Sequence, residues 1–240
     1  MSQQRVALVT GGARRIGRAI CLKLAQAGFD VAIHHHASGD DARTLADEIA
    51  GLGRRACLLQ ADLTDEAKVR ALIPAAVEAL GPVSVLVNNA SIFEYDTMRS
   101  ATMQGWDRHL GSNLRAPFQL VQAFAAQCPK ARPDENGEPQ AAGLVVNMVD
   151  QRVLKPTPEF MTYSIAKAAL WSLSQSRKPA SILGAAGRYT RESRTGRYGQ
   201  VMSFGQMIGS GPPLFRVRQL LALVDAGLAH FLGDHPTVSI

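Results

Sequence analysis

Two residues four positions apart carry the clearest chemical signal in the sequence. Tyr163 and Lys167 lie in the run Met161-Thr-Tyr-Ser-Ile-Ala-Lys167. Residues at i and i+4 share one face of a helix, so the Lys ammonium is expected beside the Tyr hydroxyl. There it would lower the pKa of the phenol from about 10 by stabilising the phenolate. The pair therefore predicts a tyrosine that exchanges a proton during a reaction.

A glycine-rich turn near the N-terminus adds a nucleotide site to this prediction. Thr10-Gly-Gly-Ala-Arg-Arg-Ile-Gly17 follows the first apolar run of the chain. Gly11 and Gly17 would let the backbone turn sharply and approach a pyrophosphate at the start of the next helix. A glycine pattern alone is weak, and an ordinary strand-to-helix turn is the alternative. With the Tyr–Lys pair, the turn predicts a hydride-transfer enzyme with Tyr163 as proton donor.

The basic residues around this turn favour NADP(H) over NAD. Arg14 and Arg15 stand where small residues would ease phosphate approach, and their guanidinium groups can clamp an extra phosphate. NAD sites place an acid about 20 residues past the glycines, on the ribose 2′-hydroxyl. This chain has His34-His-His-Ala-Ser38 there and no carboxylate until Asp40. The alternative is that these histidines alternate in and out of a strand end; no metal site is expected, because three adjacent histidines do not share a face.

The order of elements predicts an α/β fold, a doubly wound parallel sheet of the Rossmann type. Strands are expected at Arg5 to Thr10, Asp30 to His35, Ala56 to Gln60, Val83 to Asn88 and Leu144 to Val149. Helices are expected at about Arg14 to Ala27, Asp40 to Leu52, Asp65 to Leu80 and Asn113 to Gln127. Thr64 is the expected N-cap of the third helix, and residues 129 to 141 are expected to form an exposed loop.

Composition and charge exclude several classes of function. The net charge is +6, but residues 1 to 176 carry 18 basic and 17 acidic side chains, so the excess lies in residues 177 to 240. We therefore expect no nucleic-acid partner. No apolar run approaches the roughly 18 residues of a membrane span, so no membrane partner is expected either. Without a signal-like N-terminus, three cysteines lacking metal-ligand spacing predict free thiols in the cytoplasm.

Two further segments fit a ligand site at one edge of the sheet. Asn88-Asn-Ala-Ser91 ends the fourth expected strand, at the carboxyl edge where ligands bind in open α/β folds. Asn113 follows Leu110-Gly-Ser112 at an expected helix start. It is either a simple N-cap or a member of a proton relay, and the residues alone leave both open.

Taken together, these motifs resemble the short-chain dehydrogenase/reductase family. More narrowly the chain is similar to pteridine reductases, over Gly12-Ala-Arg-Arg-Ile-Gly17, His34 to Ser38, Asn88-Asn-Ala-Ser-Ile-Phe93, Gly111-Ser-Asn113, Asn147-Met-Val-Asp150 and the Tyr163 segment. The similarity spans residues 5 to roughly 175. It implies an NADPH-dependent reductase of a small pterin or dihydrofolate-like substrate, and a homo-oligomer, tetramer or dimer.

The resemblance also implies roles for individual residues. The catalytic residues would be Tyr163, Lys167, Asp150 and Asn113. The substrate would contact Ser91, Phe93, Asp150 and Tyr163, with the Phe93 ring stacked on the pterin; on composition alone Phe93 would more often be a core residue. The cofactor would contact Gly11, Arg14, Arg15, Ile16, Gly17, His35, His36, Ser38, Asp62, Leu63, Asn89, Ala90, Ser91, Tyr163 and Lys167. Ala37 stands where the family often has Arg, which predicts weaker phosphate affinity.

Asp150 separates subfamilies on chemical grounds. It precedes Tyr163 by 13 residues, where most short-chain reductases carry a Ser that binds the substrate carbonyl. A carboxylate there would repel the alkoxide forming from a ketone, whereas a C=N bond needs a proton delivered to nitrogen. The alternatives are a solvated turn residue at 150, a carbonyl or 3-ketoacyl reductase, and a non-catalytic nucleotide-binding remnant.

The last quarter of the chain departs from the family. We expect residues 1–176 to form the dinucleotide-binding and catalytic core, and residues 177–240 a divergent segment of the same domain. Residues 181 to 211 hold seven glycines and four arginines with little periodicity, and the family's Val-Asn…Pro-Gly strand is missing. An apolar stripe at 214–228 predicts one more helix and 237–240 a short strand. A shifted reading frame is our hypothesis; real divergence is the alternative.

Overall fold

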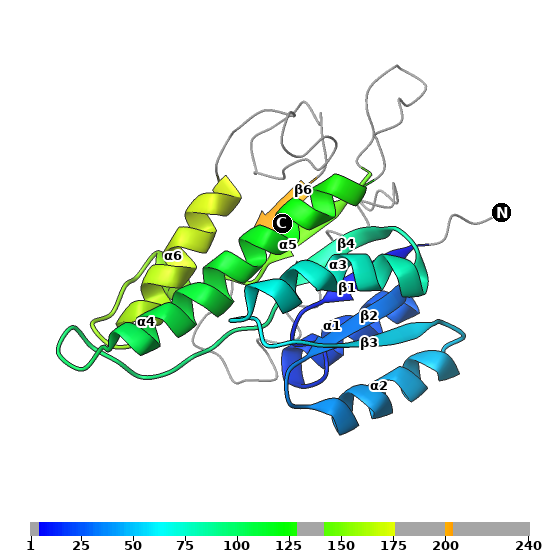
Figure 1. The fold of residues 1–240 in the computed structure, drawn as a ribbon, viewed down its shortest axis with the longest axis horizontal. Coiled ribbons are helices and arrows are strands. Elements are labelled where there is room, and N and C mark those ends of the chain that lie inside the picture. The colour runs from blue at the N-terminus through cyan, green and yellow to red at the C-terminus, as the bar shows by residue number, and fades with distance from the viewer. Residues whose placement is uncertain (1–4, 129–141, 176–199, 204–240) are drawn as a thin grey trace, which may run out of the picture.

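A computed structural model describes residues 5–128 and 142–175, and the backbone of 200–203 (Figure 1). The strands are β1 (Val6–Val9), β2 (Asp30–His35), β3 (Ala56–Gln60), β4 (Val83–Asn88), β5 (Leu144–Asn147) and β6 (Gln200–Ser203). The helices are α1 (Arg15–Gln26), α2 (Gly39–Gly51), α3 (Glu66–Leu80), α4 (Met103–Leu110), η1 (Gly111–Arg115), α5 (Ala116–Gln127), η2 (Gln151–Val153) and α6 (Met161–Gln175).

The described strands form one parallel sheet in the order β3-β2-β1-β4-β5-β6. This is the strand order of a doubly wound dinucleotide-binding sheet, so the predicted fold class is confirmed. Strand order reverses next to β1, whose Val9 pairs with Ile33 of β2 and Val87 of β4. The carboxyl ends of these three strands therefore meet at one edge, where the predicted site residues follow.

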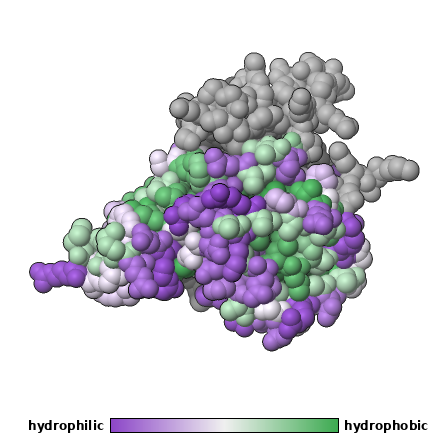
Figure 2. All heavy atoms as spheres, viewed as in Figure 1, coloured by the Kyte–Doolittle hydropathy of each residue, from purple (hydrophilic) through white to green (hydrophobic). Residues whose placement is uncertain are grey.

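Two apolar layers sandwich the sheet, because its buried strands point apolar side chains to both faces. On one face α1 and α2 pack with Ile20, Leu24, Leu45 and Ile49 against the strands. On the other, α3 and α5 pack with residues such as Leu72 and Phe124. Figure 2 shows hydrophilic side chains mixed with smaller hydrophobic areas on the viewed face of the described chain. The helices thus cover the sheet with their apolar sides.

Two predicted helix starts were wrong. Asn113 does not begin a helix: it lies in η1, one turn of π-helix inside an unbroken run from Met103 to Gln127. The N-cap of α3 is Asp65, whose side chain accepts hydrogen bonds from the N–H groups of Ala67 and Lys68, rather than Thr64. Two strands are also shorter than expected, ending at Val9 and Asn147.

Several predictions fall outside the described residues. The expected loop at 129–141, the helix at 214–228 and the strand at 237–240 lie there, as does nearly all of the departing segment. Within that segment β6 is described, and its backbone pairs in parallel with β5. Among the described helices none is long and apolar enough to cross a bilayer.

Candidate active site

The glycine-rich turn between β1 and α1 is fixed by steric limits. Gly11 has a φ of +61°, a left-handed conformation that favours glycine. A Cβ on Gly17 would lie 2.0 Å from the Gly11 carbonyl oxygen, which no real contact allows. Arg15, the first residue of α1, also has a positive φ of 51° and is exposed. The contact between Gly11 and Gly17 is the close approach of turn and helix that a pyrophosphate site requires.

His34, a residue that the sequence analysis did not assign to the site, holds the glycine-rich turn in place. Its Nδ1 accepts a hydrogen bond of 3.1 Å from the Gly11 N–H, and its Nε2 lies 3.1 Å from the Ala61 carbonyl oxygen. Because Nδ1 accepts, the ring proton must lie on Nε2 and be donated to Ala61. Burial lowers the pKa of His34 to about 4, which keeps the ring neutral.

Asn89 and Thr10 join the turn to the end of β4. The Asn89 Nδ2 donates to the carbonyl oxygens of Thr10 at 2.8 Å and Gly11 at 3.1 Å. The Thr10 hydroxyl oxygen accepts from the N–H groups of Asn89 and Ala90, at 2.9 and 3.0 Å. The segment predicted to bind the cofactor after β4 is therefore tied directly to the glycine turn.

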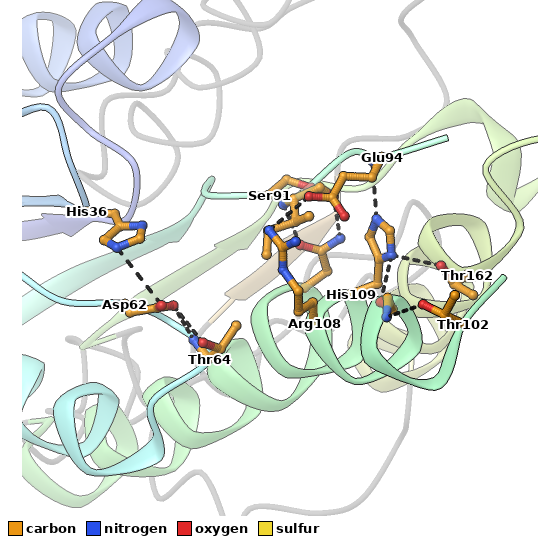
Figure 3. A network of polar contacts seen from close by, with 12 residues as sticks. His36, Asp62, Thr64, Ser91, Glu94, Thr102, Arg108, His109 and Thr162 are labelled. Carbon is orange, nitrogen blue, oxygen red and sulfur yellow. Dashed lines mark hydrogen bonds and ion pairs between the residues drawn. The ribbon is translucent and has the colours of Figure 1, made fainter. Parts of the chain in front are cut away.

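The residues expected to select a 2′-phosphate lie on two segments: Arg14 and Arg15 in the glycine-rich turn after β1, and His36 and Ser38 after β2. The Arg14 guanidinium is paired with Asp41 at 2.5 Å, whereas Arg15 has no ion pair with any described residue. His36 Nε2 lies 3.9 Å from Asp62 Oδ2, as Figure 3 shows. Hydrogen bonds from Thr64 hold the pKa of Asp62 below its ordinary value.

Other members of this predicted cofactor set are placed as follows. Ser38 is the N-cap of α2 but its side chain makes no capping bond. His35 is buried, and its Nδ1 has no hydrogen-bond partner among the described residues. Leu63 is buried and Ile16 packs on the core. The exposed Arg15 and the free Ser38 hydroxyl fit a bound phosphate group, whose oxygens would accept their hydrogen bonds.

The catalytic candidates meet at the end of β5. The Tyr163 hydroxyl donates a 3.1 Å hydrogen bond to Asp150 Oδ2. Asp150 Oδ1 also accepts from the Arg152 N–H at 2.9 Å and from its Nη1 at 3.3 Å. Burial, followed by the Asp150 charge, raises the pKa of Tyr163 above its ordinary value. In this state the proton of the pair belongs to Tyr163, and Asp150 is no mere solvated turn residue.

Lys167 behaves differently from its prediction. Its Nζ donates a 2.7 Å hydrogen bond to the Met148 carbonyl oxygen and lies 5.8 Å from the Tyr163 ring centroid. Burial lowers the pKa of Lys167 to about 8. The expected lowering of the Tyr163 pKa by Lys167 was wrong, because burial and the Asp150 charge raise this pKa instead.

Asn113 uses its whole amide to hold one backbone unit. Its Oδ1 accepts from the Ile92 N–H at 2.9 Å, and its Nδ2 donates to the Ile92 carbonyl oxygen at 2.8 Å. The simple N-cap interpretation was therefore wrong. The π-turn η1 aims this side chain at the segment that follows β4, in keeping with the frequent occurrence of such turns at functional sites.

Phe93 lies in an aromatic group beside Tyr163 and is half exposed, so it is not a core residue. Its ring is stacked on Phe160, with centroids 4.2 Å apart, and meets the Tyr163 ring edge-on at 4.7 Å. The Arg152 guanidinium lies over both phenylalanine rings, at 5.5 and 5.1 Å from their centroids. Ser91, exposed nearby, donates to the Ile92 carbonyl oxygen at 3.3 Å.

Arg152 and Phe160 were missed by sequence reasoning. The sequence did hold a signal for Arg152, since an Asp followed two residues later by an Arg suits a capped turn, and Asp150 is the N-cap of η2. No local pattern pointed to Phe160. Within residues 5–128 and 142–175 no group of three His, Cys, Asp or Glu side chains is arranged to hold a metal ion.

The sequence model of the short chain dehydrogenase family matches residues 5–179. The chain therefore belongs to the short-chain dehydrogenase family. Among curated proteins it is 31% identical over 176 residues to the 3-oxoacyl-(acyl-carrier-protein) reductase FabG of Staphylococcus aureus, covering 73% of this chain and 68% of that protein. It is 40% identical over 119 residues to the short-chain dehydrogenase/reductase FrzI of a Cladobotryum species, covering 50% and 46%.

Two similar solved structures are NADP complexes. FolM alternative dihydrofolate reductase 1 from Brucella canis is 43% identical, with a TM-score of 0.64 over 71% of this chain and 64% of that one. A short chain dehydrogenase from Burkholderia cenocepacia is 35% identical, with a TM-score of 0.64 over 72% and 66%. The chain thus spans about half the length of the Cladobotryum relative and just under two thirds of the Brucella enzyme.

Proposed function

We propose that the protein is an NADPH-dependent reductase of a pterin or dihydrofolate-like substrate. The observation that carries this proposal is the hydrogen bond from Tyr163 to Asp150, with the half-exposed Phe93 ring beside it. A carboxyl group paired with a phenol suits proton delivery to a ring nitrogen, and the aromatic ring suits a flat heteroaromatic substrate. The likeness to an enzyme named as an alternative dihydrofolate reductase supports it.

For the cofactor, we propose that the glycine turn holds the pyrophosphate while Arg15, His36 and Ser38 hold the 2′-phosphate. NADPH, when bound, supplies the hydride for the reduction. In this proposal Lys167, whose ammonium lies on the Met148 carbonyl and 5.8 Å from the centroid of the Tyr163 ring, would hold Tyr163 and the nicotinamide ribose. The NADP complexes of similar enzymes support this assignment.

The proton path follows from the hydrogen bond already in place. Burial keeps Tyr163 protonated, so the phenol is the reservoir of the proton. The proton passes from the Tyr163 hydroxyl to Asp150 and from Asp150 to the substrate nitrogen. The C=N bond becomes CH–NH, since its carbon gains the hydride and its nitrogen gains this proton. Phe93 orients the substrate ring, and Asn113 holds the backbone next to it.

A second candidate is a carbonyl or 3-oxoacyl reductase, favoured by the likeness to FabG over 176 residues. In that reaction Asp150 would face a developing alkoxide, which its charge opposes. The pterin reaction avoids this repulsion because its acceptor atom is a nitrogen that gains a proton.

Substitution of Asp150 tests the proposal against this rival. Asp150→Asn keeps the shape and one hydrogen bond but removes the carboxylate that would relay the Tyr163 proton, so dihydropterin turnover should fall by about 10²- to 10⁴-fold. Asp150→Ser should raise activity on an activated ketone relative to the pterin. Pterin turnover by Asp150→Asn at the parent rate would refute the assigned role.

Three further points stay proposals. We propose that the protein is a homo-oligomer and lies in the cytoplasm. Light scattering of the purified protein tests its oligomeric state. We also propose that residues 177–240 depart from the family because the reading frame shifts near residue 177. Resequencing of the coding DNA tests this, and an unshifted frame would reject it. Complete absence of turnover with intact NADPH binding would instead indicate a nucleotide-binding remnant.

A further inference from the structure

The first turn of α6, which carries Tyr163, lacks a capping side chain next to it in sequence. A helix leaves its first N–H groups without intrahelical partners, and Ser, Thr, Asp or Asn just before the helix usually accepts from one of them. Here Phe160 precedes the helix, with a positive φ of 55° and no side-chain acceptor. The Ser164 N–H donates to the Phe160 carbonyl oxygen in the usual helical way. The Thr162 N–H lies in the first turn, where the helix offers it no acceptor, so it needs a partner from elsewhere.

That partner comes from a residue 66 positions earlier. Asp96, in the segment between β4 and α4, accepts from the Thr162 N–H at 3.2 Å through Oδ1. Its Oδ2 accepts a short hydrogen bond from the Thr162 hydroxyl. Asp96 is 7% exposed and Thr162 is fully buried. A carboxylate at the N-terminus of a helix is also favoured by the helix dipole, so Asp96 caps α6 from a distance.

His109 of α4 closes the arrangement. Its Nε2 accepts from the Glu94 N–H at 3.2 Å, so the ring proton lies on Nδ1. Nδ1 lies 2.7 Å from the Thr162 hydroxyl oxygen and 3.0 Å from the Gly105 carbonyl oxygen. The Thr162 hydroxyl therefore accepts from His109 and donates to Asp96. Figure 3 shows His109 between Glu94 and Thr162.

In this Asp96–Thr162–His109 network, each hydrogen-bond donor faces an acceptor. A buried network satisfied in this way holds one geometry, because breaking any bond leaves a buried polar group unpaired. The segment that it holds carries Phe93, and the helix carries Tyr163 as the residue next to Thr162. Asn113 hydrogen-bonds Ile92 of the same segment and makes no hydrogen bond to α6 among the described residues.

We propose that Asp96, Thr162 and His109 are positioning residues that set the Tyr163 hydroxyl against the Phe93 ring. The network fixes the spacing of the proton donor and the stacking platform, now 4.7 Å between ring centroids. The catalytic consequence rests on the proposed function, whereas the anchoring of α6 does not. Because a displacement of about 1 Å can cost on the order of 100-fold in rate, a loosened network should act on kcat.

The matched pair Thr162→Val and Thr162→Ser tests the proposal. Both Val and Thr are β-branched, so Thr162→Val removes the hydroxyl at nearly constant shape and helix preference. We expect Thr162→Val to lower kcat for a dihydropterin by at least about tenfold, with the Kd for NADPH changed by less than about twofold. Thr162→Ser, which keeps the hydroxyl, should restore most of the lost kcat. Equal losses in both variants, or a loss confined to NADPH binding, would overturn the positioning role.

Amide hydrogen exchange supplies a readout that needs no substrate. In Thr162→Val, the backbone amide at position 162 and the amide of Glu94 should exchange with solvent at least about tenfold faster than in the parent. The Ile92 amide, which donates to Asn113, is the internal control and should exchange at its parent rate. Unchanged exchange at the two network amides would overturn the anchor itself. If the parent protein reduces no pterin while these amides respond as expected, the proposed function fails and the anchor stands.

Asp96→Asn carries the same test if Thr162→Val does not fold. It keeps an acceptor for the Thr162 N–H but removes the charge at the helix N-terminus. The same split, lower kcat with unchanged NADPH affinity, is expected. A parent-like kcat in Asp96→Asn, or a loss confined to NADPH binding, would overturn the positioning role.

Discussion

The two halves of the site are held by different means. Around the glycine turn, position is set by close contact of the backbone, since Gly17 has no room for a Cβ beside Gly11, and the buried His34 ring accepts from the Gly11 N–H. Around Tyr163, position is set by hydrogen bonds between side chains, those of Tyr163 with Asp150 and of Thr162 with Asp96. In the proposed reaction, the first half would need a fixed shape for a phosphate group, whereas the second would need groups that exchange protons.

This difference predicts where substitutions act. Changes at the turn should weaken NADPH binding or fold stability, and changes near Tyr163 should slow turnover of bound substrate. The aromatic side of the catalytic half is also more open, with Phe93 and Tyr95 50% and 66% exposed, so it can accept a ring. Four variants test this difference between the two halves of the site.

Tyr163→Phe should have the largest effect. It removes the hydroxyl that donates to Asp150 while keeping the ring that meets Phe93. We expect kcat to fall by about 10²- to 10⁴-fold, because the general acid is lost. The Kd for NADPH, measured by fluorescence titration, should stay nearly unchanged. A variant that keeps most of its rate would show that the proton comes from another group.

His34, which holds the glycine-rich turn, should make the stability of the protein depend on pH. Burial lowers the pKa of His34 to about 4 from its ordinary 6.5. Between these values the unfolded chain binds a proton that the folded chain does not, so stability falls as the pH falls from 6.5 to 4. The loss amounts to about 3 kcal/mol.

His34→Asn is the control for this effect, since it offers an acceptor to Gly11 without titrating. Urea unfolding at several pH values should show a steeper loss for the parent than for the variant in that window. Parallel curves for the two proteins would contradict the buried neutral histidine.

Gly17→Ala tests the steric half of the comparison directly. The added Cβ cannot coexist with the Gly11 carbonyl, so the turn must open. We expect stability to fall by about 2 kcal/mol and NADPH affinity to fall with it. Gly105→Ala, whose Cβ would lie 3.4 Å from its nearest neighbour, is a matched glycine control elsewhere. Normal NADPH binding by Gly17→Ala would remove the turn from the cofactor site.

Arg15→Ala should have the smallest effect, confined to cofactor choice. We expect the parent protein to bind NADPH about tenfold tighter than NADH, a difference of about 1.4 kcal/mol. The variant should lose most of this preference, because Arg15 is exposed and unpaired among the described residues. Arg14→Ala is the comparison, since Arg14 is already paired with Asp41. Equal affinities for the two cofactors in the parent would count against the 2′-phosphate assignment.

Local patterns were enough to predict most of the fold. The bounds of β2, β3 and β4 match the predicted bounds. Strands β2 and β4 are buried and read as largely apolar segments, whereas the edge strand β3 is only partly buried. Helix α4 was missed, since Met103–Leu110 is short and largely polar. Its capping residue Thr102, whose side chain accepts from the Gly105 N–H, was a signal that could have been used.

The site was predictable only where spacing decides proximity. The Tyr163–Asp150 contact was expected from the family resemblance and is present. The effect of Lys167 was not predicted correctly, because spacing gives the helix face but not the Met148 carbonyl that draws the ammonium away. Asp96 and Thr162 are 66 residues apart, and only the packing of α4 against α6 brings them together.

The central claim is that the protein reduces a pterin ring with NADPH. A comparison of kcat/KM for three substrates tests it most directly. The purified protein with NADPH is given a dihydropterin, dihydrofolate or a 3-oxoacyl thioester, and cofactor oxidation is followed with each. The account predicts that kcat/KM for the dihydropterin or dihydrofolate exceeds that for the thioester by at least about tenfold, which corresponds to about 1.4 kcal/mol of transition-state stabilisation. A preference for the thioester would contradict the account.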